Sequence, residues 1–170
     1  MNKRFITIMT VLILGSLVLA ACGGTATETE TTTKIKVCQI TDTGGIDDKS
    51  FNATAWKGVQ DAMDKLGVEG KYLESKEVAD YEKNLNAFIE EKCDLIITVG
   101  FLIGDATKAA AEANPDMKFS IVDYSYDPPI PNVVGQIFNT DEAAFLAGYL
   151  AAGVTKTGKV GTFGGLPIPT

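Results

Sequence analysis

A regular alternation of short apolar segments and amphipathic segments runs from Lys34 onward, and it restricts the fold more than any other feature. Apolar residues at helical spacing predict helices at 50–66, 80–92, 102–113 and 140–154. Strands are predicted at 34–41, 71–75, 94–100, 118–123 and 132–138, and a sixth begins at 158–164. Connections in such an alternation are nearly always right-handed crossovers. The predicted fold class is therefore α/β, a Rossmann-like parallel sheet with helices on both faces.

Hydroxyl side chains mark the start of two of these helices. Ser50 is predicted to cap the first helix, which Gly67 ends. Thr140 is predicted to cap the last helix in the same way.

Composition excludes several classes of function. The chain has 170 residues, a formal net charge of −7 and no histidine. The acidic balance disfavours a nucleic-acid-binding surface, which needs clustered lysine and arginine. The absence of histidine excludes serine–histidine and cysteine–histidine nucleophiles and histidine-containing zinc sites. We expect no cofactor, no metal and no nucleic-acid partner.

The first 33 residues are predicted to lie outside the fold. Residues 1–21 have a basic start and an apolar run that is too short for a membrane span of about 20 residues, so they indicate an export signal. The run ends in Leu-Ala-Ala-Cys at Cys22, which resembles the lipobox of bacterial lipoproteins and makes Cys22 the expected lipidation site. A plain secretory signal is the alternative. Residues 22–33 are almost devoid of apolar side chains and are predicted to form a flexible tether.

Two further cysteines, Cys38 and Cys93, lie in or next to predicted buried strands. Export permits a disulfide. Free buried thiols are nevertheless the default expectation.

Ligands of open parallel sheets bind beyond the carboxyl ends of the strands, where the strand order reverses. The residues at those ends are Thr41–Asp42, Gly100–Phe101, Asp123–Tyr124 and Gly164–Gly165. The segment TDTGGIDDKSFN, residues 41–52, follows the first strand and leads into the first helix. It is therefore predicted to lie at the binding edge.

The loop 41–52 has the position of a phosphate-binding loop but not its chemistry. A Walker loop ending at Lys49 would need glycine at Thr43 and Asp48. Three aspartates would repel a phosphate. The loop matches no calcium-binding loop either.

The loop's residues instead suit a neutral, hydroxyl-rich, flat ligand. Asp42 offers a carboxylate to a sugar diol, Phe51 offers a ring face to a planar base, and Asn52 offers both a donor and an acceptor. The alternative interpretation is purely structural. In it, Ser50 caps the helix, Phe51 packs against its first turn and Asn52 is solvated.

The loop, together with KFSIVD at 118–123 and FNTDEAAFLAGYLAA at 138–152, resembles the basic membrane protein (BMP) family. That family consists of lipoprotein substrate-binding components of ABC importers, typified by purine-nucleoside receptors. The resemblance implies a periplasmic-binding-protein type I fold, in which two α/β lobes close over the ligand. It also implies that Asp42 binds ribose hydroxyls, Phe51 stacks on the base, and Asn52 and Asp123 bond the base edge. Phe101, at a strand end, is a further candidate.

Members of that family are about twice as long as this chain. Residues 34–170 are therefore expected to form the N-terminal ligand-binding lobe, apparently truncated before the second lobe. The function expected from the resemblance is capture of guanosine, inosine or adenosine by a membrane-anchored, extracytoplasmic lipoprotein that serves an ABC permease and ATPase. Two alternatives remain open. One is binding of another sugar-like or signal molecule, and the other is a nucleoside-hydrolysing surface enzyme using Asp42 and Asp48 as a carboxylate pair.

Overall fold

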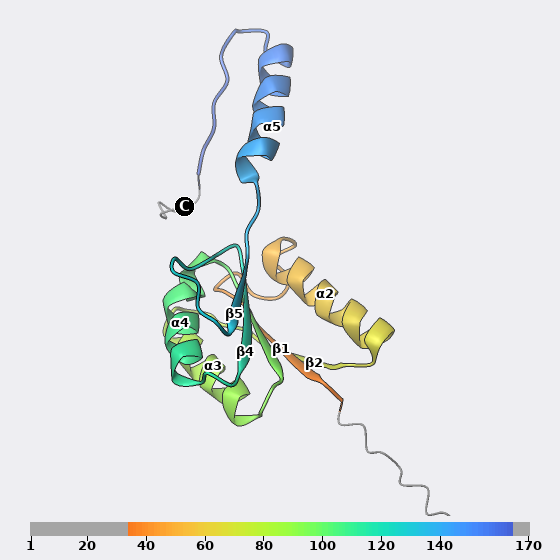
Figure 1. Ribbon diagram of the computed structural model, residues 1–170. Coiled ribbons are helices and arrows are strands. Elements are labelled where there is room, and N and C mark those ends of the chain that lie inside the picture. The colour runs from red at the N-terminus through yellow and green to blue at the C-terminus, as the bar shows by residue number, and fades with distance from the viewer. Residues whose placement is uncertain (1–33, 165–170) are drawn as a thin grey trace, which may run out of the picture. The chain divides into compact units, whose positions relative to one another are not determined.

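The computed structural model describes residues 34–164, and the predicted signal peptide, Cys22 and the tether lie outside the described residues. Strands and helices alternate along most of this segment, as predicted (Figure 1). In chain order the elements are β1 (Lys36–Ile40), α2 (Phe51–Leu66), β2 (Glu69–Leu73), α3 (Asp80–Glu90), β3 (Leu95–Val99), the 3-10 helix η2 (Phe101–Ile103), α4 (Gly104–Ala113), β4 (Lys118–Val122), β5 (Val133–Gln136) and α5 (Thr140–Val154).

All five strands are parallel and form one sheet in the order β2-β1-β3-β4-β5. In this register, Gln39 in β1 lies between Tyr72 in β2 and Ile97 in β3. The sheet confirms the predicted α/β fold class. Its strand order reverses between β1 and β3, because the chain moves from β1 to β2 on one side and then crosses to β3 on the other.

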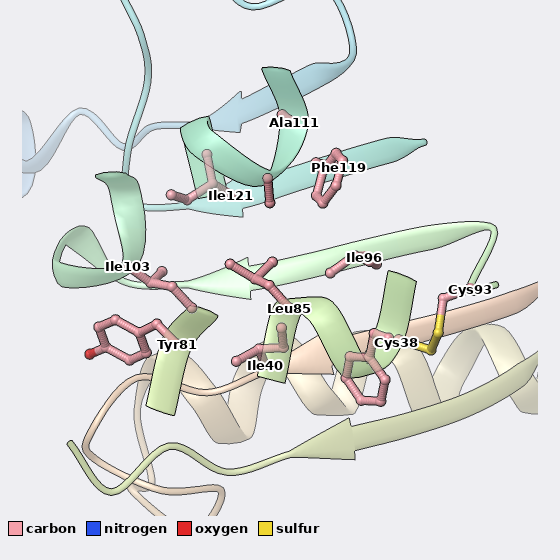
Figure 2. Close-up of a cluster of buried hydrophobic side chains, with 12 residues drawn as sticks. Cys38, Ile40, Tyr81, Leu85, Cys93, Ile96, Ile103, Ala111, Phe119 and Ile121 are labelled. Atoms are coloured by element: carbon pink, nitrogen blue, oxygen red, sulfur yellow. A yellow bond between two sulfur atoms is a disulfide. The ribbon is translucent and has the colours of Figure 1, made fainter. Parts of the chain in front are cut away.

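Helices cover both faces of the sheet (Figure 1). Helix α2 contacts β1, β2 and β3, whereas α3 and α4 pack together and against β1 and β4. The main core lies between the sheet and α3 and α4, where Leu85 and Tyr81 of α3 face Ile40 and Ile96 of the strands (Figure 2). Burial of these apolar side chains supplies most of the driving force for this packing. The core therefore fixes the strands whose carboxyl ends carry the candidate site.

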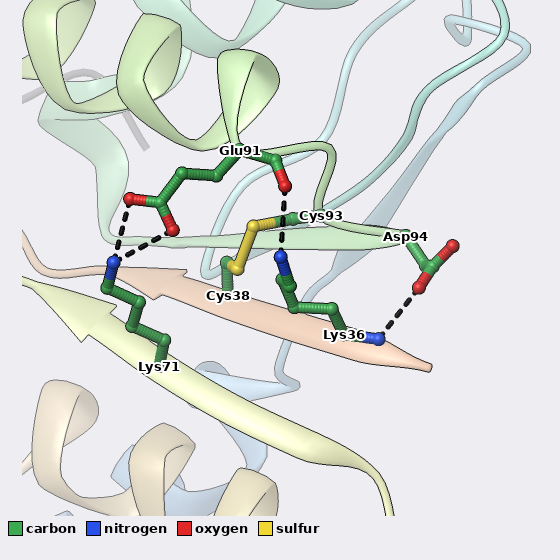
Figure 3. The surroundings of a disulfide bond; sticks show 6 residues. All are labelled: Lys36, Cys38, Lys71, Glu91, Cys93 and Asp94. Carbon is green, nitrogen blue, oxygen red and sulfur yellow. Dashed lines mark hydrogen bonds and ion pairs between the residues drawn. A yellow bond between two sulfur atoms is a disulfide. The ribbon is translucent and has the colours of Figure 1, made fainter. Parts of the chain in front are cut away.

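Cys38 and Cys93 form a disulfide, so the expectation of free thiols is wrong. The two residues are fully or almost fully buried, at 0% and 1% exposure, and their Cα atoms are 6.1 Å apart. Burial among strands did not prevent bridging. Pairing of β1 with β3 sets Cys38 opposite Ile96, and Cys93 lies only three residues before Ile96, so the two cysteines come within bridging distance. The Lys71–Glu91 ion pair and the Lys36–Asp94 hydrogen bond lie around the bridge (Figure 3).

The predicted cap at Ser50 is confirmed in its position, whereas the predicted cap at Thr140 is wrong. Ser50 occupies the cap position of α2 but makes no capping hydrogen bond through its side chain within residues 34–164. The carboxylate of Asp48 bonds the first amides of α2 instead. At α5 the cap position is Asn139, and Thr140 is already the first helical residue.

The predicted sixth strand is also not formed, since residues 158–164 have no regular structure. A strand acquires its hydrogen bonds only from a neighbouring strand, and within the described residues no strand pairs with β5 on its outer side. Helix α5 follows β5 in the chain and precedes residues 158–164. It has no buried residue in the part of the chain that the structure describes. Among these residues no helix is both long enough and apolar enough to cross a membrane.

Candidate ligand-binding site

The site is centred where the sheet changes direction, at the carboxyl ends of β1 and β3. Crevices at this point bind ligands in open parallel sheets. Asp42 follows β1 and Gly100 follows β3, and these two strands are hydrogen-bonded neighbours. A carboxylate therefore stands at the position that the fold favours for a ligand.

One oxygen of Asp42 is held by the protein and the other is open. Asp42 Oδ1 accepts hydrogen bonds from the Gly44 backbone N–H at 2.8 Å and from Asn52 Nδ2 at 2.7 Å. Asp42 Oδ2 accepts no hydrogen bond from any residue in 34–164 and lies toward Gly100. The half-buried side chain thus presents a single oriented acceptor.

Gly100 is adapted to the approach of this carboxylate. Its φ of +96° is a backbone conformation that residues with side chains rarely adopt. A Cβ at this position would lie 2.9 Å from Asp42 Oδ2. Glycine is required here both for the backbone conformation and for the space that Asp42 occupies.

Asp48 blocks the anion site at the start of α2. Its oxygens accept backbone N–H donors from Ser50, Asn52 and Ala53 at 2.9, 2.9 and 3.0 Å. Burial opposes the charge of Asp48, but these donors together outweigh it and lower the pKa of its carboxyl below the ordinary value. A phosphate at a helix start would need the same amides. The geometry therefore supports the exclusion of a phosphate-binding loop.

A second carboxylate holds the middle of the loop. Glu74 Oε1 accepts a hydrogen bond from the Ile46 backbone N–H at 2.8 Å. Together with the contacts of Asp42 and Asp48, this bond fixes the loop at its beginning, middle and end. The binding edge is therefore largely preformed.

Asn52 is fully buried, at 0% exposure, and faces Asp42. Its side-chain Nδ2 donates to Asp42 Oδ1, and its Oδ1 accepts from the Asp42 backbone N–H at 3.2 Å. The alternative in which Asn52 is solvated is wrong. In this conformation the amide reaches another site residue rather than the open crevice.

Phe51 is 44% exposed at the first turn of α2. Its ring meets that of Phe138 edge to face, with centroids 6.0 Å apart. Both rings line one end of an apolar groove of about 750 Å³ between α2 and the sheet. No carboxylate lines this groove, so its chemistry differs from that of the edge around Asp42.

Asp123 ends β4 in a left-handed conformation with φ +64°, and its N–H donates to the Gln136 carbonyl at 2.8 Å. A non-glycine residue at positive φ is uncommon and often marks a functional position. Strand β3 separates Asp123 from Asp42 in the sheet. Two strand spacings correspond to about 10 Å.

An aromatic row accompanies Asp123. Phe101, which is half-buried, packs edge to face on Tyr124 with ring centroids 5.1 Å apart. Tyr124 in turn packs on Tyr126 at 5.0 Å, and the Tyr126 hydroxyl donates to the Gly104 carbonyl at 2.7 Å. Phe101 thus belongs to an ordered cluster at the same sheet edge as Asp42 and Asp123.

Some residues of this site were not identified from the sequence. Tyr81 of α3 is 1% exposed, and its hydroxyl has no hydrogen-bond partner in the described part of the chain. Burial, and to a smaller extent the charge of Asp42, raises the pKa of this hydroxyl. Glu74 was also missed, and no pattern marked Glu74 or Tyr81 as site residues. The sequence placed Gly100 at a strand end on the binding edge, but it did not reveal the close approach of Gly100 to Asp42.

The site offers no cluster for a metal ion. Within residues 34–164, no group of three or more histidine, cysteine, aspartate or glutamate side chains gathers in a suitable arrangement.

The fold and site define a class that solved structures also represent. The chain is similar to an ABC transporter solute-binding protein from Aeropyrum pernix, with a TM-score of 0.65 and 32% identity over 69% of this chain and 32% of that one. Residues 35–170 match the family described as "ABC transporter substrate-binding protein PnrA-like". The chain belongs to this Bmp family.

Curated relatives agree with this assignment. The chain is 36% identical to the "ABC transporter nucleoside-binding protein BmpA" of Lactococcus lactis, over 98% of this chain and 49% of that protein. It is 39% identical to "Basic membrane protein A" of Borreliella burgdorferi, over 98% of this chain and 47% of the relative. The chain therefore spans about half the length of these relatives.

Proposed function

We propose that residues 34–170 form one wall of a purine-nucleoside-binding cleft in an extracytoplasmic receptor of an ABC importer. The observation that carries this proposal is the Asp42 carboxylate at the reversal of strand order, with one oxygen held and the other open. The relative from Lactococcus lactis is named a nucleoside-binding protein, which supports the ligand class.

The proposed ligand spans the sheet edge from Asp42 to Asp123. Asp42 Oδ2 accepts hydrogen bonds from the ribose hydroxyls, which are charge-assisted contacts of about 1.5–3 kcal/mol each. Asp123 accepts the ring N–H of an oxopurine such as guanine or hypoxanthine. The separation of about 10 Å, two strand spacings, suits a ribose and a base bound side by side. Phe51 and Phe101 supply aromatic surface for the base.

The cleft selects a neutral ligand. Asp48 already occupies the helix-start amides that would hold a phosphate. Asp42, Asp48 and Asp123 would also repel one. Nucleosides are therefore favoured over nucleotides.

The remainder of the receptor is proposed from the family. A second lobe closes over the ligand, Cys22 carries the lipid anchor, and the protein lies at the outer face of the cell membrane. There it delivers ligand to a permease and an ATPase. An open single lobe leaves much of the ligand in water, whereas pockets bury about 70–90% of a small ligand. Nucleoside binding by this chain alone should therefore be weak.

An enzyme that hydrolyses nucleosides with Asp42 and Asp48 is less well supported. Three backbone amides occupy the oxygens of Asp48, so this carboxylate is committed to capping α2. Binding of another sugar-like or signal molecule remains the alternative ligand class, because Asp42 would accept any vicinal diol.

The test combines calorimetric titration with guanosine, inosine and adenosine and chromatographic detection of free base. We expect saturable binding without release of base, and no binding of the corresponding monophosphates. Asp42→Asn should weaken binding of the three nucleosides at least about tenfold, because it removes the charge-assisted contacts to the ribose. Asp61→Asn, which removes an exposed charge elsewhere on α2, should not. Release of base, or equal binding of nucleotide and nucleoside, would contradict the proposal.

A further inference from the structure

We infer that Asn52 is a positioning residue that acts through Asp42 and does not itself bind the base. The inference rests on the proposed function for the identity of the ligand, but its structural basis is independent of any ligand. It assigns recognition of ribose to one atom, Asp42 Oδ2, and assigns the orientation of that atom to Asn52.

Every polar atom of Asn52 has a partner inside the protein. The side-chain Nδ2 and Oδ1 both bond Asp42, at 2.7 and 3.2 Å. The backbone N–H donates to Asp48 Oδ2 at 2.9 Å, and the backbone carbonyl accepts from Gln39 Nε2 at 3.0 Å. A base edge could bond Asn52 only by displacing one of these partners, and a displaced buried partner would be left unsatisfied.

Burial removes Asn52 from the ligand's reach. The residue is 0% exposed, as is Gln39, which holds its carbonyl from beneath. Phe51, its neighbour in the chain, is 44% exposed on the same helical turn. The first turn of α2 therefore presents its aromatic ring outward and its amide inward.

The two hydrogen bonds fix both the backbone and the side chain of Asp42. One bond holds the Asp42 amide and the other holds Oδ1, so Asn52 spans both ends of the residue. Gly44 completes the arrangement by donating its N–H to the same Oδ1. A Cβ at Gly44 would lie 3.1 Å from Asp42 Oδ1 and 3.3 Å from Asn52 Nδ2, so a side chain here would crowd the pair and shift it by a few tenths of an ångström.

Only Oδ2 of Asp42 then remains to bind the ligand. The Asp42 side chain is already oriented before the ligand binds. Preorganised groups bind more tightly because less conformational freedom is lost on association. Loss of Asn52 would leave Asp42 in place but free to rotate. The affinity should fall for every nucleoside with an intact ribose, whatever its base.

The test is a double-mutant cycle between Asn52→Ala and Asp42→Asn. Affinities of the full chain for guanosine, inosine, adenosine and 2′,3′-dideoxyinosine are measured by titration. Asn52→Ala should weaken binding of the three ribonucleosides by the same factor, about tenfold, the equivalent of one hydrogen bond. It should not weaken binding of the dideoxynucleoside. In the Asp42→Asn background, Asn52→Ala should cause no further loss.

The matched control is Asn132→Ala. Asn132 is a half-buried asparagine, and its Nδ2 donates to the carbonyls of Ala111, Asn114 and Met117, away from Asp42. Its replacement should lower the unfolding midpoint without changing relative affinities. Asn52→Ser serves as a second variant in case the alanine variant does not fold.

A ligand-independent measurement separates failure of this inference from failure of the proposed function. Amide exchange at Gly44 should become faster in Asn52→Ala than in Asn132→Ala, because Asp42 no longer holds that N–H. Unchanged Gly44 protection would overturn the inference whether or not nucleosides bind. A loss that differs between bases and persists in the Asp42→Asn background would overturn it as well, since it would indicate direct contact with the base. If no nucleoside binds while Gly44 responds as expected, the proposed function fails and the positioning role stands.

Discussion

The Cys38–Cys93 disulfide should contribute a large part of the stability of this fold. It closes a loop of 55 residues. Restriction of the unfolded chain by a loop of this length corresponds to about 4 kcal/mol at 25 °C. Domains of this size unfold with a total free energy of only about 5–15 kcal/mol. Removal of the bridge therefore threatens the folded state itself.

The perturbation is replacement of each cysteine by alanine, singly and together, and the assay is urea denaturation followed by circular dichroism. Either single replacement opens the loop, so Cys38→Ala and Cys93→Ala should each cost about 4 kcal/mol, and the double variant should cost little more. With an m value of about 1.5 kcal/mol per molar urea, each midpoint should fall by about 2.5 M.

Free thiols would give a different result. Two buried thiols that merely pack would each cost about 1 kcal/mol on truncation, and these costs would add, because the two residues would no longer share a bond. Small additive losses would therefore refute the bridge. Two additional reactive thiols in urea without reductant would refute it as well.

Four other perturbations test the site. Gly100→Ala places a Cβ 2.9 Å from Asp42 Oδ2 at φ +96°, so it should cost about 1–3 kcal/mol in thermal denaturation and weaken nucleoside binding in titrations. The pKa of the Asp48 carboxyl is lowered in the folded state, so ionised Asp48 adds to the free energy of unfolding. This stabilisation is fully present above the ordinary carboxyl pKa of about 3.9, and it is lost as the pH falls through the lower folded pKa. Asp48→Asn should therefore be less stable than wild type by about 1 kcal/mol at pH 6, and the urea curves of the two should converge once the pH lies below the lowered folded pKa. Phe51→Ala should weaken nucleoside binding by about 1–3 kcal/mol in calorimetry with little change in melting temperature, since the ring is 44% exposed. Asp123→Asn should cost inosine and guanosine about 1–3 kcal/mol but adenosine less, whereas equal losses would indicate a structural role.

The fold class could be predicted because its signals are local. Apolar runs such as 94–100 and helical spacing at 80–92 specify their own structure, and crossover handedness then leaves few topologies. Residues 158–164 have a strand-like composition but no strand, because strand formation depends on a paired neighbour rather than on the segment alone. Prediction therefore succeeded for the five strands that pair with a neighbouring strand, and it failed for residues 158–164, which pair with none in the described part of the chain.

The site could be placed at the correct edge, but its internal geometry could not be derived. The sequence could not show that Asn52 faces inward, because this depends on the rotation of α2 about its axis relative to β1. Ser50 was preferred as a cap since it directly precedes the helix, whereas Asp48 reaches the same amides from two residues earlier. The bridge between Cys38 and Cys93 depends on the pairing of strands far apart in the chain.

Helix α5 also has a consequence for how this chain melts. Four of its large apolar side chains are 65–76% exposed, namely Phe145, Leu146, Tyr149 and Leu150. Within residues 34–164 none of its side chains is buried, so its helicity there rests on intrinsic propensity, and a helix of 15 residues is marginal in water. The helix should therefore lose its far-ultraviolet signal gradually on heating, ahead of the sheet. The calorimetric peak should then report residues 34–136 alone, with a heat of unfolding smaller than the length of the chain suggests.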